Sequence, residues 1–292
     1  MRVAGFLFIR NAIKYDYPVK EALLSLLPLC DEVVVSIGNS EDETEQLIQS
    51  IQSPKIRIYS SVWDDTLLEG GKVLAVETDK AFDHVSAGAD WCIYLQGDEL
   101  IHEDDYAVIR ENMARYKDDP GVEGFLFKYR HFYGSYDYLG DSRRWYSHEI
   151  RIIRNDKRIR SYRDAQGFRK NGQKLPVKLL DAHIYHYGWV RHPSQQLQKH
   201  LNFEKLYNLD NLARRVSVDK IEDYDYEEID SLQKFTGSHP AVMQELIAHK
   251  NWSFSADISK KNFTLKGWFH YWMEKLTGRR FFEYKNYKIV RK

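Results

Sequence analysis

The chain has 292 residues, and its 43 basic and 43 acidic side chains give a formal net charge of +0. This length suits one large domain or one domain with an appendage, and the balanced charge argues against nucleic acid as the main partner. Hydrophobic residues make up 43% of the chain, enough for a core. The many aromatic side chains fit core packing, with sugar-stacking platforms as the alternative.

The two cysteines and the lengths of the apolar runs indicate the cellular compartment. Cys30 and Cys92 each lie beside apolar residues without metal-ligand spacing, so both are expected to be buried reduced thiols. The first apolar run ends at Arg10 and is too short for a signal peptide. No run approaches the roughly 20 apolar residues of a membrane span. We therefore expect a cytoplasmic protein.

Strand and helix signals alternate over the first 116 residues. Strands are predicted over 3–9, 32–37, 55–59 and 91–95, and helices over 18–27, 41–51, 72–85 and 102–116. Ser40 is expected to cap the second helix, with Glu43 as its capping-box partner. This alternation predicts a mostly parallel α/β sheet flanked by helices. Ligands bind such sheets outside the carboxyl ends of the strands.

The pattern changes after Gly121. The segments "GFLFKYRHFYG", "HEIRIIR" and 182–189 alternate with the two-residue period of strands. A helical period follows over 193–207, and the remainder is charged, helical and irregular. We therefore expect an α/β domain over 1–192 and a helical extension over 193–292.

The segment "CIYLQGDELI" places Asp98 and Glu99 directly after an apolar strand. Carboxylate oxygens are the ligands that Mg²⁺ and Mn²⁺ prefer, often together with substrate phosphates. A bound cation would neutralise charge on a diphosphate leaving group. A solvated turn uses the same residue types and is the alternative.

Several short motifs occur in an order that resembles the family 2 glycosyltransferases of the GT-A fold. The second strand is followed by Ser40, Asp42 and Thr44, in the pattern of that family, and Gly71-Lys72 matches its Gly-Lys-x-x-Ala segment. Its Asp-x-Asp motif falls on Gln96-Gly97-Asp98. The resemblance covers about residues 3 to 190. It implies a GT-A-like (Rossmann-like) fold, a nucleotide-diphosphate sugar donor, a glycan or lipid-linked acceptor, and Mn²⁺ or Mg²⁺.

The sequence departs from the family at two places. Gln96 replaces the first aspartate of Asp-x-Asp, so it brings no charge to a metal. Ile37 and Gly38 stand where the family has an acidic residue that reads the nucleotide base, which leaves this role to Asn39, Asp42 or Asp65.

Further nucleotide-sugar contacts are expected from Lys72 and from Arg10 and Asn11. The positive charge of Lys72 suits a diphosphate contact. A solvated lysine in the first turn of a helix is the alternative interpretation. Arg10 and Asn11 end the first strand, and Asn11 either contacts the nucleotide or caps the next segment.

The resemblance also suggests a metal-binding histidine and a catalytic base. The expected metal ligands are Asp98, Glu99 and His186; His183 should point to the opposite face of its strand. An inverting transfer needs a carboxylate to deprotonate the acceptor hydroxyl. We expect Asp164 in this role, with Glu149 as the alternative, although Glu149 also suits an ion pair with a nearby arginine.

The basic and aromatic C-terminal stretch "LKGWFHYWMEKLTGRR" has apolar residues at helical spacing. Such a helix either lies at the inner face of a membrane, near a lipid-linked acceptor, or docks on its own domain or on a second subunit.

Two other functions remain open. A nucleotidyltransferase also uses a strand-end carboxylate and a metal, but "FIRNAIKYDYP" lacks its glycine-rich phosphate loop. A non-catalytic module that binds a glycan or nucleotide would explain the neutral Gln96.

Overall fold

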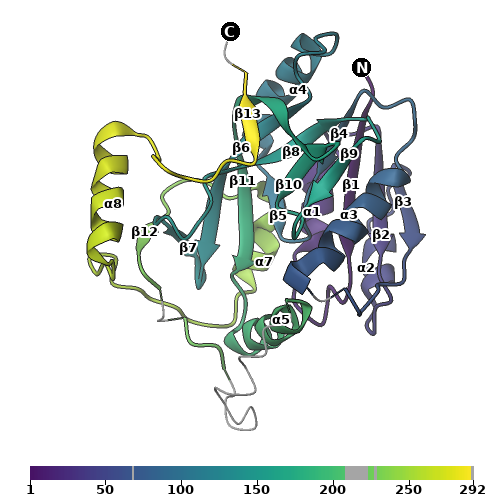
Figure 1. Ribbon diagram of the computed structural model, residues 1–292. Coiled ribbons are helices and arrows are strands. Elements are labelled where there is room, and N and C mark those ends of the chain that lie inside the picture. The colour runs from purple at the N-terminus through teal and green to yellow at the C-terminus, as the bar shows by residue number, and fades with distance from the viewer. Residues whose placement is uncertain (68, 208–222, 227–228, 291–292) are drawn as a thin grey trace.

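The computed structural model describes residues 1–67, 69–207, 223–226 and 229–290 (Figure 1). The first half contains β1 (Val3–Ile9), α1 (Val19–Leu26), β2 (Glu32–Ile37), α2 (Thr44–Gln49), β3 (Ile56–Ser60), α3 (Lys72–Asp83), β4 (Trp91–Tyr94), β5 (Glu99–Ile101) and α4 (Tyr106–Arg115). The second half contains β6 (Gly124–Tyr133), β7 (Ser135–Gly140), β8 (His148–Arg154), β9 (Ile159–Tyr162), β10 (Gly167–Lys170), β11 (Gln173–Trp189), α5 (Pro193–Leu206), β12 (Leu232–Lys234), α7 (Gln244–Ala248), α8 (Leu265–Thr277) and β13 (Tyr287–Ile289).

One mixed sheet organises the described residues. Its main strand order is β3-β2-β1-β4-β8-β6-β11-β10-β9. The first four strands are parallel, and β4 then pairs with β8 in the antiparallel sense. The predicted α/β class with a parallel sheet and flanking helices is therefore confirmed. The strands predicted after Gly121 join the same sheet, several of them in antiparallel pairs.

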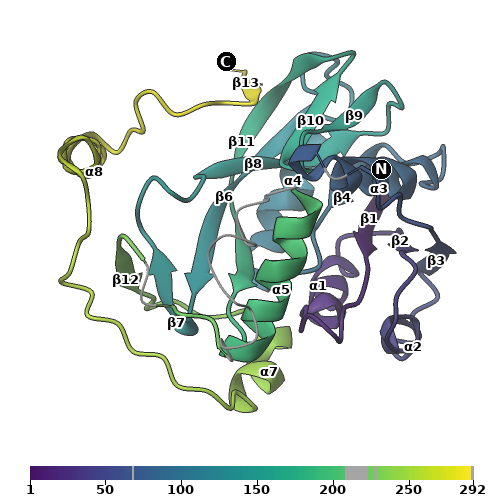
Figure 2. The same cartoon turned by 60° about the horizontal axis from the view of Figure 1, so that its bottom comes forward.

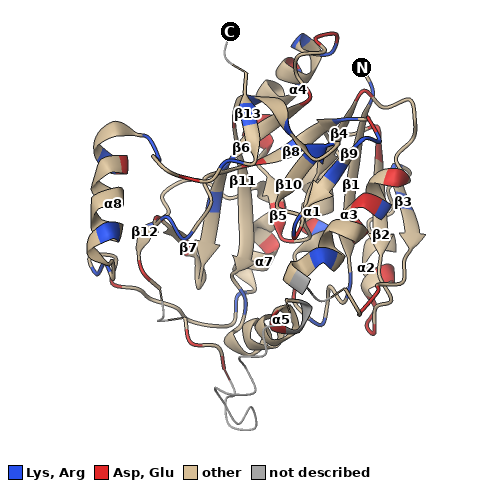
Figure 3. Ribbon diagram, in the orientation of Figure 1, with Lys and Arg blue, Asp and Glu red and all other residues tan. Residues whose placement is uncertain are grey.

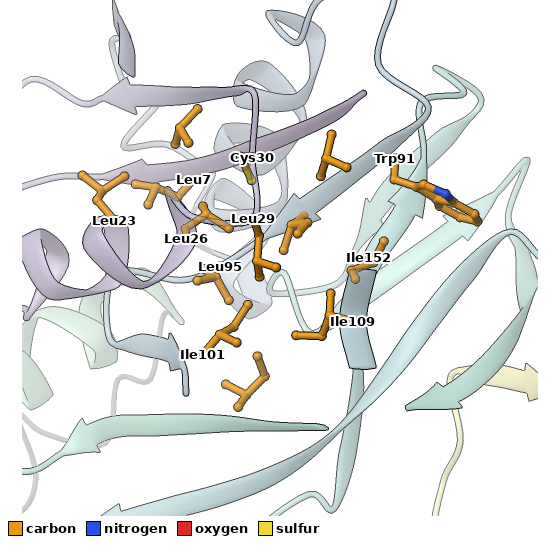
Figure 4. Close-up of a cluster of buried hydrophobic side chains, with 14 of the residues drawn as sticks. Leu7, Leu23, Leu26, Leu29, Cys30, Trp91, Leu95, Ile101, Ile109 and Ile152 are labelled. Carbon is orange, nitrogen blue, oxygen red and sulfur yellow. The ribbon is translucent and has the colours of Figure 1, made fainter. Parts of the chain in front are cut away.

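The core lies on both faces of the sheet, because side chains alternate along each strand. Val3 and Leu7 of β1 pack in the cluster that α1 and α4 cover, whereas Phe6 packs on the α3 side. Figure 4 shows the first of these clusters, where Leu23 and Leu26 of α1 approach the strands. Strands buried on both faces explain why the first strand signals are continuous apolar runs.

One helix start differs from the prediction. The second helix begins at Thr44 rather than near residue 41, and no side chain caps it. The Ser40 hydroxyl instead accepts a hydrogen bond from the backbone N–H of Asn11 at 3.0 Å. The predicted capping role of Ser40 is wrong because a loop distant in sequence takes up its oxygen.

The C-terminal third is less purely helical than expected. β12 pairs with β7, and β13 pairs in parallel with β11, so this part of the chain adds two strands to the sheet. Between them α8 stands away from the body of the protein (Figures 1 and 2). α8 buries none of its residues fully, although its Glu274 carboxylate lies 3.5 Å from Nε of Arg143. Docking of α8 on its own domain or on a second subunit therefore stays a prediction. Within the described residues, no helix is long and apolar enough to cross a membrane.

The two-sided core makes a stability prediction. Leu23 is fully buried between α1 and the sheet, so Leu23→Ala should lower the free energy of unfolding by about 2–5 kcal/mol. Urea denaturation followed by circular dichroism measures this. The matched control is Leu276→Ala on α8, where the side chain is 79% exposed and the loss should stay within about 0.5 kcal/mol. Equal losses in both variants would contradict this assignment of the core.

Candidate functional site

A cavity of about 800 Å³ opens at the carboxyl ends of β1 and β4. Its walls come from the ends of these strands, from the loop after β9, from the end of β11 and from α5. Figure 1 shows α5 below the sheet, at the edge toward which β1 runs. The cavity therefore lies where α/β sheets place their ligands.

Hydrogen bonds interlock the loops after β1 and β2. The Asn11 side chain accepts from the backbone N–H of Glu41 at 2.7 Å, and Thr44 Oγ1 accepts from the N–H of Ala12 at 2.7 Å. Asp42 accepts from the N–H of Lys14 at 2.7 Å. These bonds satisfy backbone donors that no strand or helix would satisfy. The polar residues after β2 thus hold the loop after β1 in place, and Asn11 of that loop lines the cavity.

The outer wall of the cavity contains Arg10, Trp63 and Asp65. Arg10 forms an ion pair with Asp65 at 2.9 Å, and its guanidinium lies 5.5 Å from the centre of the Trp63 ring. A Cβ atom on Gly38 would lie 2.4 Å from Nε1 of Trp63, so only glycine lets this ring approach the end of β2. Trp63 is only 8% exposed, so most of its indole supports this wall from behind, next to the cation of Arg10.

The inner wall holds a buried charge cluster around Asp98. Lys199 on α5 donates a hydrogen bond to Asp98 Oδ2 at 2.9 Å, and Nε2 of His186 lies 3.6 Å from Oδ1. Lys199 also donates to the Gly188 carbonyl at 2.9 Å. Asp98 and Lys199 are only 5% and 7% exposed. A charged pair so deeply buried is stable only because each member has a partner.

Burial and charge act in opposite directions in this cluster. Burial acts to raise the pKa of Asp98, but the positive charges of Lys199 and Arg191 hold the pKa well below its usual range. Burial lowers the pKa of Lys199 to about 8; Arg191 adds to this effect and Asp98 opposes it. Asp98 is therefore a carboxylate at neutral pH.

A second histidine fixes how His186 faces the cavity. Nε2 of His131 lies 2.9 Å from the carbonyl oxygen of Tyr146, which only accepts, so this nitrogen carries the proton. Burial holds the pKa of His131 well below its ordinary value, so its Nδ1 is free to accept from Nδ1 of His186 at 2.9 Å. Burial also lowers the pKa of His186, which leaves its Nε2 as an acceptor beside Asp98.

Glu99 belongs to a structural ion pair. The Arg151 guanidinium on β8 donates two hydrogen bonds to its carboxylate, at 2.7 and 2.8 Å, and the Tyr129 hydroxyl donates a third at 2.8 Å. Glu99 is fully buried, and Arg151 nearly so. The carboxylate oxygens are therefore occupied by protein donors, and this bidentate geometry is among the strongest that side chains make.

The two candidate bases lie in different surroundings. Asp164 lines the cavity, and its Oδ2 accepts a hydrogen bond from the Tyr207 hydroxyl at 2.7 Å. Gly71 permits this arrangement, since a Cβ atom there would lie 2.9 Å from Asp164 and 2.8 Å from Tyr207. Glu149 is buried in β8, and burial raises its pKa to about 8 against the effect of Arg151. Glu149 is therefore mostly protonated at neutral pH.

The structure gathers some of the predicted site residues and separates others. The predicted residues that line the cavity are Arg10, Asn11, Asp65, Gln96, Asp98, Asp164 and His186. Five further predicted residues are not among its described lining residues: Asn39, Asp42, Lys72, Glu99 and Glu149. His183 is likewise outside the described lining, as its strand position predicted.

Local contacts explain two of these separations. Asp42 is occupied by the loop hydrogen bonds described above, and Lys72 is exposed in the first turn of α3. The glycine before it, Gly71, contacts the site instead.

Several cavity residues were not predicted from the sequence. Lys199 shares one helix face with Gln196 and Phe203, which also line the cavity, but a helical lysine is ordinarily solvated. Arg151 lies within an apolar strand, and a charged residue at such a position indicates a buried partner. That partner, Glu99, lies 52 positions away in the chain, so the pair cannot be read from local sequence. Tyr207 had no local signal that separated it from core aromatics, whereas Trp63 lies in the loop with Asp65 that follows β3.

No protein-family model and no curated protein matches this chain. Among solved structures, S. aureus TarS 1-349 matches at 13% identity and a TM-score of 0.37, over 75% of this chain and 77% of that one. Glucosyl-3-phosphoglycerate synthase from Mycobacterium tuberculosis, in complex with Mg²⁺ and uridine diphosphate, matches at 17% identity and a TM-score of 0.29, over 45% and 43%.

A third solved structure is 4-diphosphocytidyl-2C-methyl-D-erythritolsynthase from Anaerococcus prevotii DSM 20548, at 8% identity and a TM-score of 0.33, over 53% of this chain and 70% of that one. Likenesses this distant carry no conclusion about the chemistry of the present chain. Its fold class rests on its own strand order, and its site on its own side chains.

The donor set at Asp98 does not fit the divalent ion that the sequence resemblance implies. Among the described residues, no group of three or more His, Cys, Asp or Glu side chains could hold a metal ion. Glu99 is engaged by Arg151, and Gln96 is neutral. Only Asp98 and His186 remain of the three predicted ligands, and the ammonium of Lys199 already neutralises Asp98.

The ion pair behind the site gives a second stability prediction. Arg151→Met leaves the Glu99 carboxylate buried without its cation, and should lower the free energy of unfolding by roughly 3–5 kcal/mol. Urea denaturation measures the change. Arg158→Met is the matched control, because its ion pair with Asp156 is exposed and should be worth at most about 1 kcal/mol. Wild-type stability of Arg151→Met would show that the pair does not stabilise the fold.

Proposed function

We propose that this protein is a glycosyltransferase similar to family 2, which moves a sugar from a nucleotide-diphosphate sugar to a hydroxyl group with inversion. One observation carries the proposal. A single cavity at the strand ends contains the Asp98–Lys199–His186 cluster, the carboxylate of Asp164 and an aromatic wall. A transfer of this kind needs these three parts: a charged seat for the diphosphate, a base for the acceptor, and a surface for the nucleoside.

The donor is proposed to lie along the ends of β1 and β4. The nucleoside would lie against the part of the Trp63 indole that reaches the cavity, and Arg10 and Asn11 offer polar contacts at the end of β1. The diphosphate would lie toward Asp98 and Lys199, with Gln96 beside it. Nε2 of His186 is an acceptor and suits a sugar hydroxyl, which can donate to it. Asn39 and Asp42 are not among the described lining residues, and they would support this wall through the loop that follows β2.

Asp164 is proposed as the base. It takes the proton from the acceptor hydroxyl while the hydroxyl oxygen forms a bond to the anomeric carbon. The bond from that carbon to the diphosphate oxygen breaks on the opposite face, and the diphosphate leaves with the electron pair. The hydrogen bond from Tyr207 orients the carboxylate. Glu149 suits the role less well, because it is mostly protonated at neutral pH and lies outside the described lining.

One observation favours a second candidate, a non-catalytic module that binds a nucleotide sugar. Gln96 stands where the family has a charged ligand, and this substitution reduces the charge available at the site. This candidate predicts binding without turnover. A nucleotidyltransferase has no comparable support, since the loop after β1 contains no glycine-rich phosphate cradle.

The acceptor is proposed to be a glycan or a lipid-linked molecule at an anionic membrane surface. The face of α8 exposes Leu265, Phe269, Trp272 and Leu276, which recur one turn apart. Lysines and arginines on α8 and just after it, blue in Figure 3, flank this face. A basic amphipathic helix with aromatic residues suits the interface of anionic lipids.

The catalytic proposal predicts a loss of turnover in Asp164→Asn. The wild type, tested with a panel of UDP-, GDP-, CDP- and dTDP-sugars, should hydrolyse or transfer one of them, with inverted configuration read by NMR. Removing the base should lower the rate by about 10²–10⁴ while leaving nucleotide affinity nearly unchanged. Asp181→Asn, an exposed carboxylate paired with Lys128, is the control. A fully active Asp164→Asn would refute the base, and wild-type binding without any turnover would support the module.

The membrane proposal predicts binding to anionic vesicles. The protein should sediment with phosphatidylglycerol-containing vesicles and not with pure phosphatidylcholine, and Trp272→Ser should weaken this several-fold. Val62→Ser, which changes an exposed apolar side chain after β3, should have no effect. No sedimentation, or a dimer in analytical ultracentrifugation that Trp272→Ser dissociates, would instead assign the face to a second copy of the chain.

A further inference from the structure

We propose that the ammonium of Lys199 is the positive charge that binds the diphosphate, so that the donor binds without a divalent metal. This inference rests on the proposed donor class and assigns a role to a residue that the sequence motifs do not mark. Asp98 then acts as a positioning residue for Lys199 rather than as a metal ligand.

The position of Lys199 is built into the fold. Its Nζ atom donates to Asp98 Oδ2 and to the Gly188 carbonyl, both at 2.9 Å. An ammonium group has three donors, so among the described contacts one donor is left for a ligand in the cavity that Lys199 lines. The rings of Tyr17 and Phe203 lie 4.8 and 5.5 Å from Nζ and hold the stem in place.

Gly188 also helps to position Lys199. A Cβ atom on it would lie 2.6 Å from Nε2 of His186 and 3.2 Å from Asp98 Oδ2, so the cluster has no room for any other residue. Its carbonyl accepts from Lys199 and also from Nη1 of Arg191 at 3.0 Å. One backbone oxygen therefore accepts from two cations, and of these two Lys199 lines the cavity.

A divalent ion would have to compete with this arrangement. At Asp98 it would approach an ammonium that already lies 2.9 Å from the same carboxylate, and the two positive charges would repel each other in a buried place. Displacing Lys199 would leave its charge buried without a partner. Four carboxylates occur among the described lining residues, and three of them, Glu41, Asp65 and Asp98, have a lysine or arginine partner. The fourth, Asp164, bonds to Tyr207.

Charge chemistry makes lysine a suitable substitute. It binds phosphate as a compact point charge, and a charge-assisted hydrogen bond is about twice as strong as a neutral one. The neutral Gln96 agrees with this reading, because a site without a metal does not need a second carboxylate next to Asp98.

The test is calorimetric titration of the full chain with UDP, GDP, CDP and dTDP, first with EDTA and then with excess Mn²⁺. We expect one nucleotide to bind with affinities that agree within about twofold in the two conditions. In Lys199→Met, affinity in EDTA should fall about ten- to a hundredfold. Because Asp98 is then unpaired, Mn²⁺ should restore part of that loss. Lys128→Met, which removes a surface lysine outside the described cavity lining, should bind as the wild type does.

The outcomes separate the two proposals. Wild-type binding that requires Mn²⁺ would overturn the role of Lys199 and leave the proposed donor class intact. Absence of binding by any nucleotide in either condition would overturn the donor class, and this inference with it. The comparison of EDTA with Mn²⁺ uses the wild type alone, so it decides the question even if Lys199→Met does not fold. Wild-type affinity of a folded Lys199→Met would also overturn the inference.

Discussion

The buried ion pair between Glu99 and Arg151 holds the site together. Glu99 lies in β5, which pairs with β11 opposite His186, and Arg151 comes from β8. The same guanidinium approaches the carbonyl oxygen of Gln166 at 3.4 Å, in the loop that carries Asp164. One arginine thus ties together three walls of the cavity, and the chain between Gln96 and Glu99 has little freedom to move. The position of Asp98 follows from this constraint, because Asp98 is the residue next to the anchored one.

The sequence specified the parallel half of the fold well, because its signals are local. Strands over 3–9 and 32–37 were predicted with their observed ends, since apolar runs bounded by turns are read directly from the chain. The polar strand ends at Arg10, Asp65 and Asp98 also came together as expected, because parallel strands end at one edge. What sequence reasoning missed depends on distant pairs. Lys199 meets Asp98 across 101 positions, and no local pattern distinguishes a buried helical lysine from a solvated one.

The residues that carried the sequence resemblance have mostly supporting roles in this structure. Ser40, Asp42 and Thr44 join the loops after β1 and β2, and Gly71 makes space for Asp164 and Tyr207. A motif can therefore lie beside a cavity while most of its side chains support the loops there rather than line the cavity. Short polar side chains and glycines recur at such places because turns at strand ends need backbone donors satisfied and close approaches allowed.

The segment that carries α8 is fixed at both of its ends. β12 pairs with β7 on one side, and on the other Arg280 donates to the Trp145 carbonyl at 2.5 Å before β13 joins β11. A helix attached at one end only tethers a protein to whatever it binds. A helix attached at both ends cannot rotate freely relative to the domain. A partner that binds its apolar face therefore also sets the direction in which the cavity opens. Acceptor choice would then depend on orientation and reach as well as on the shape of the cavity.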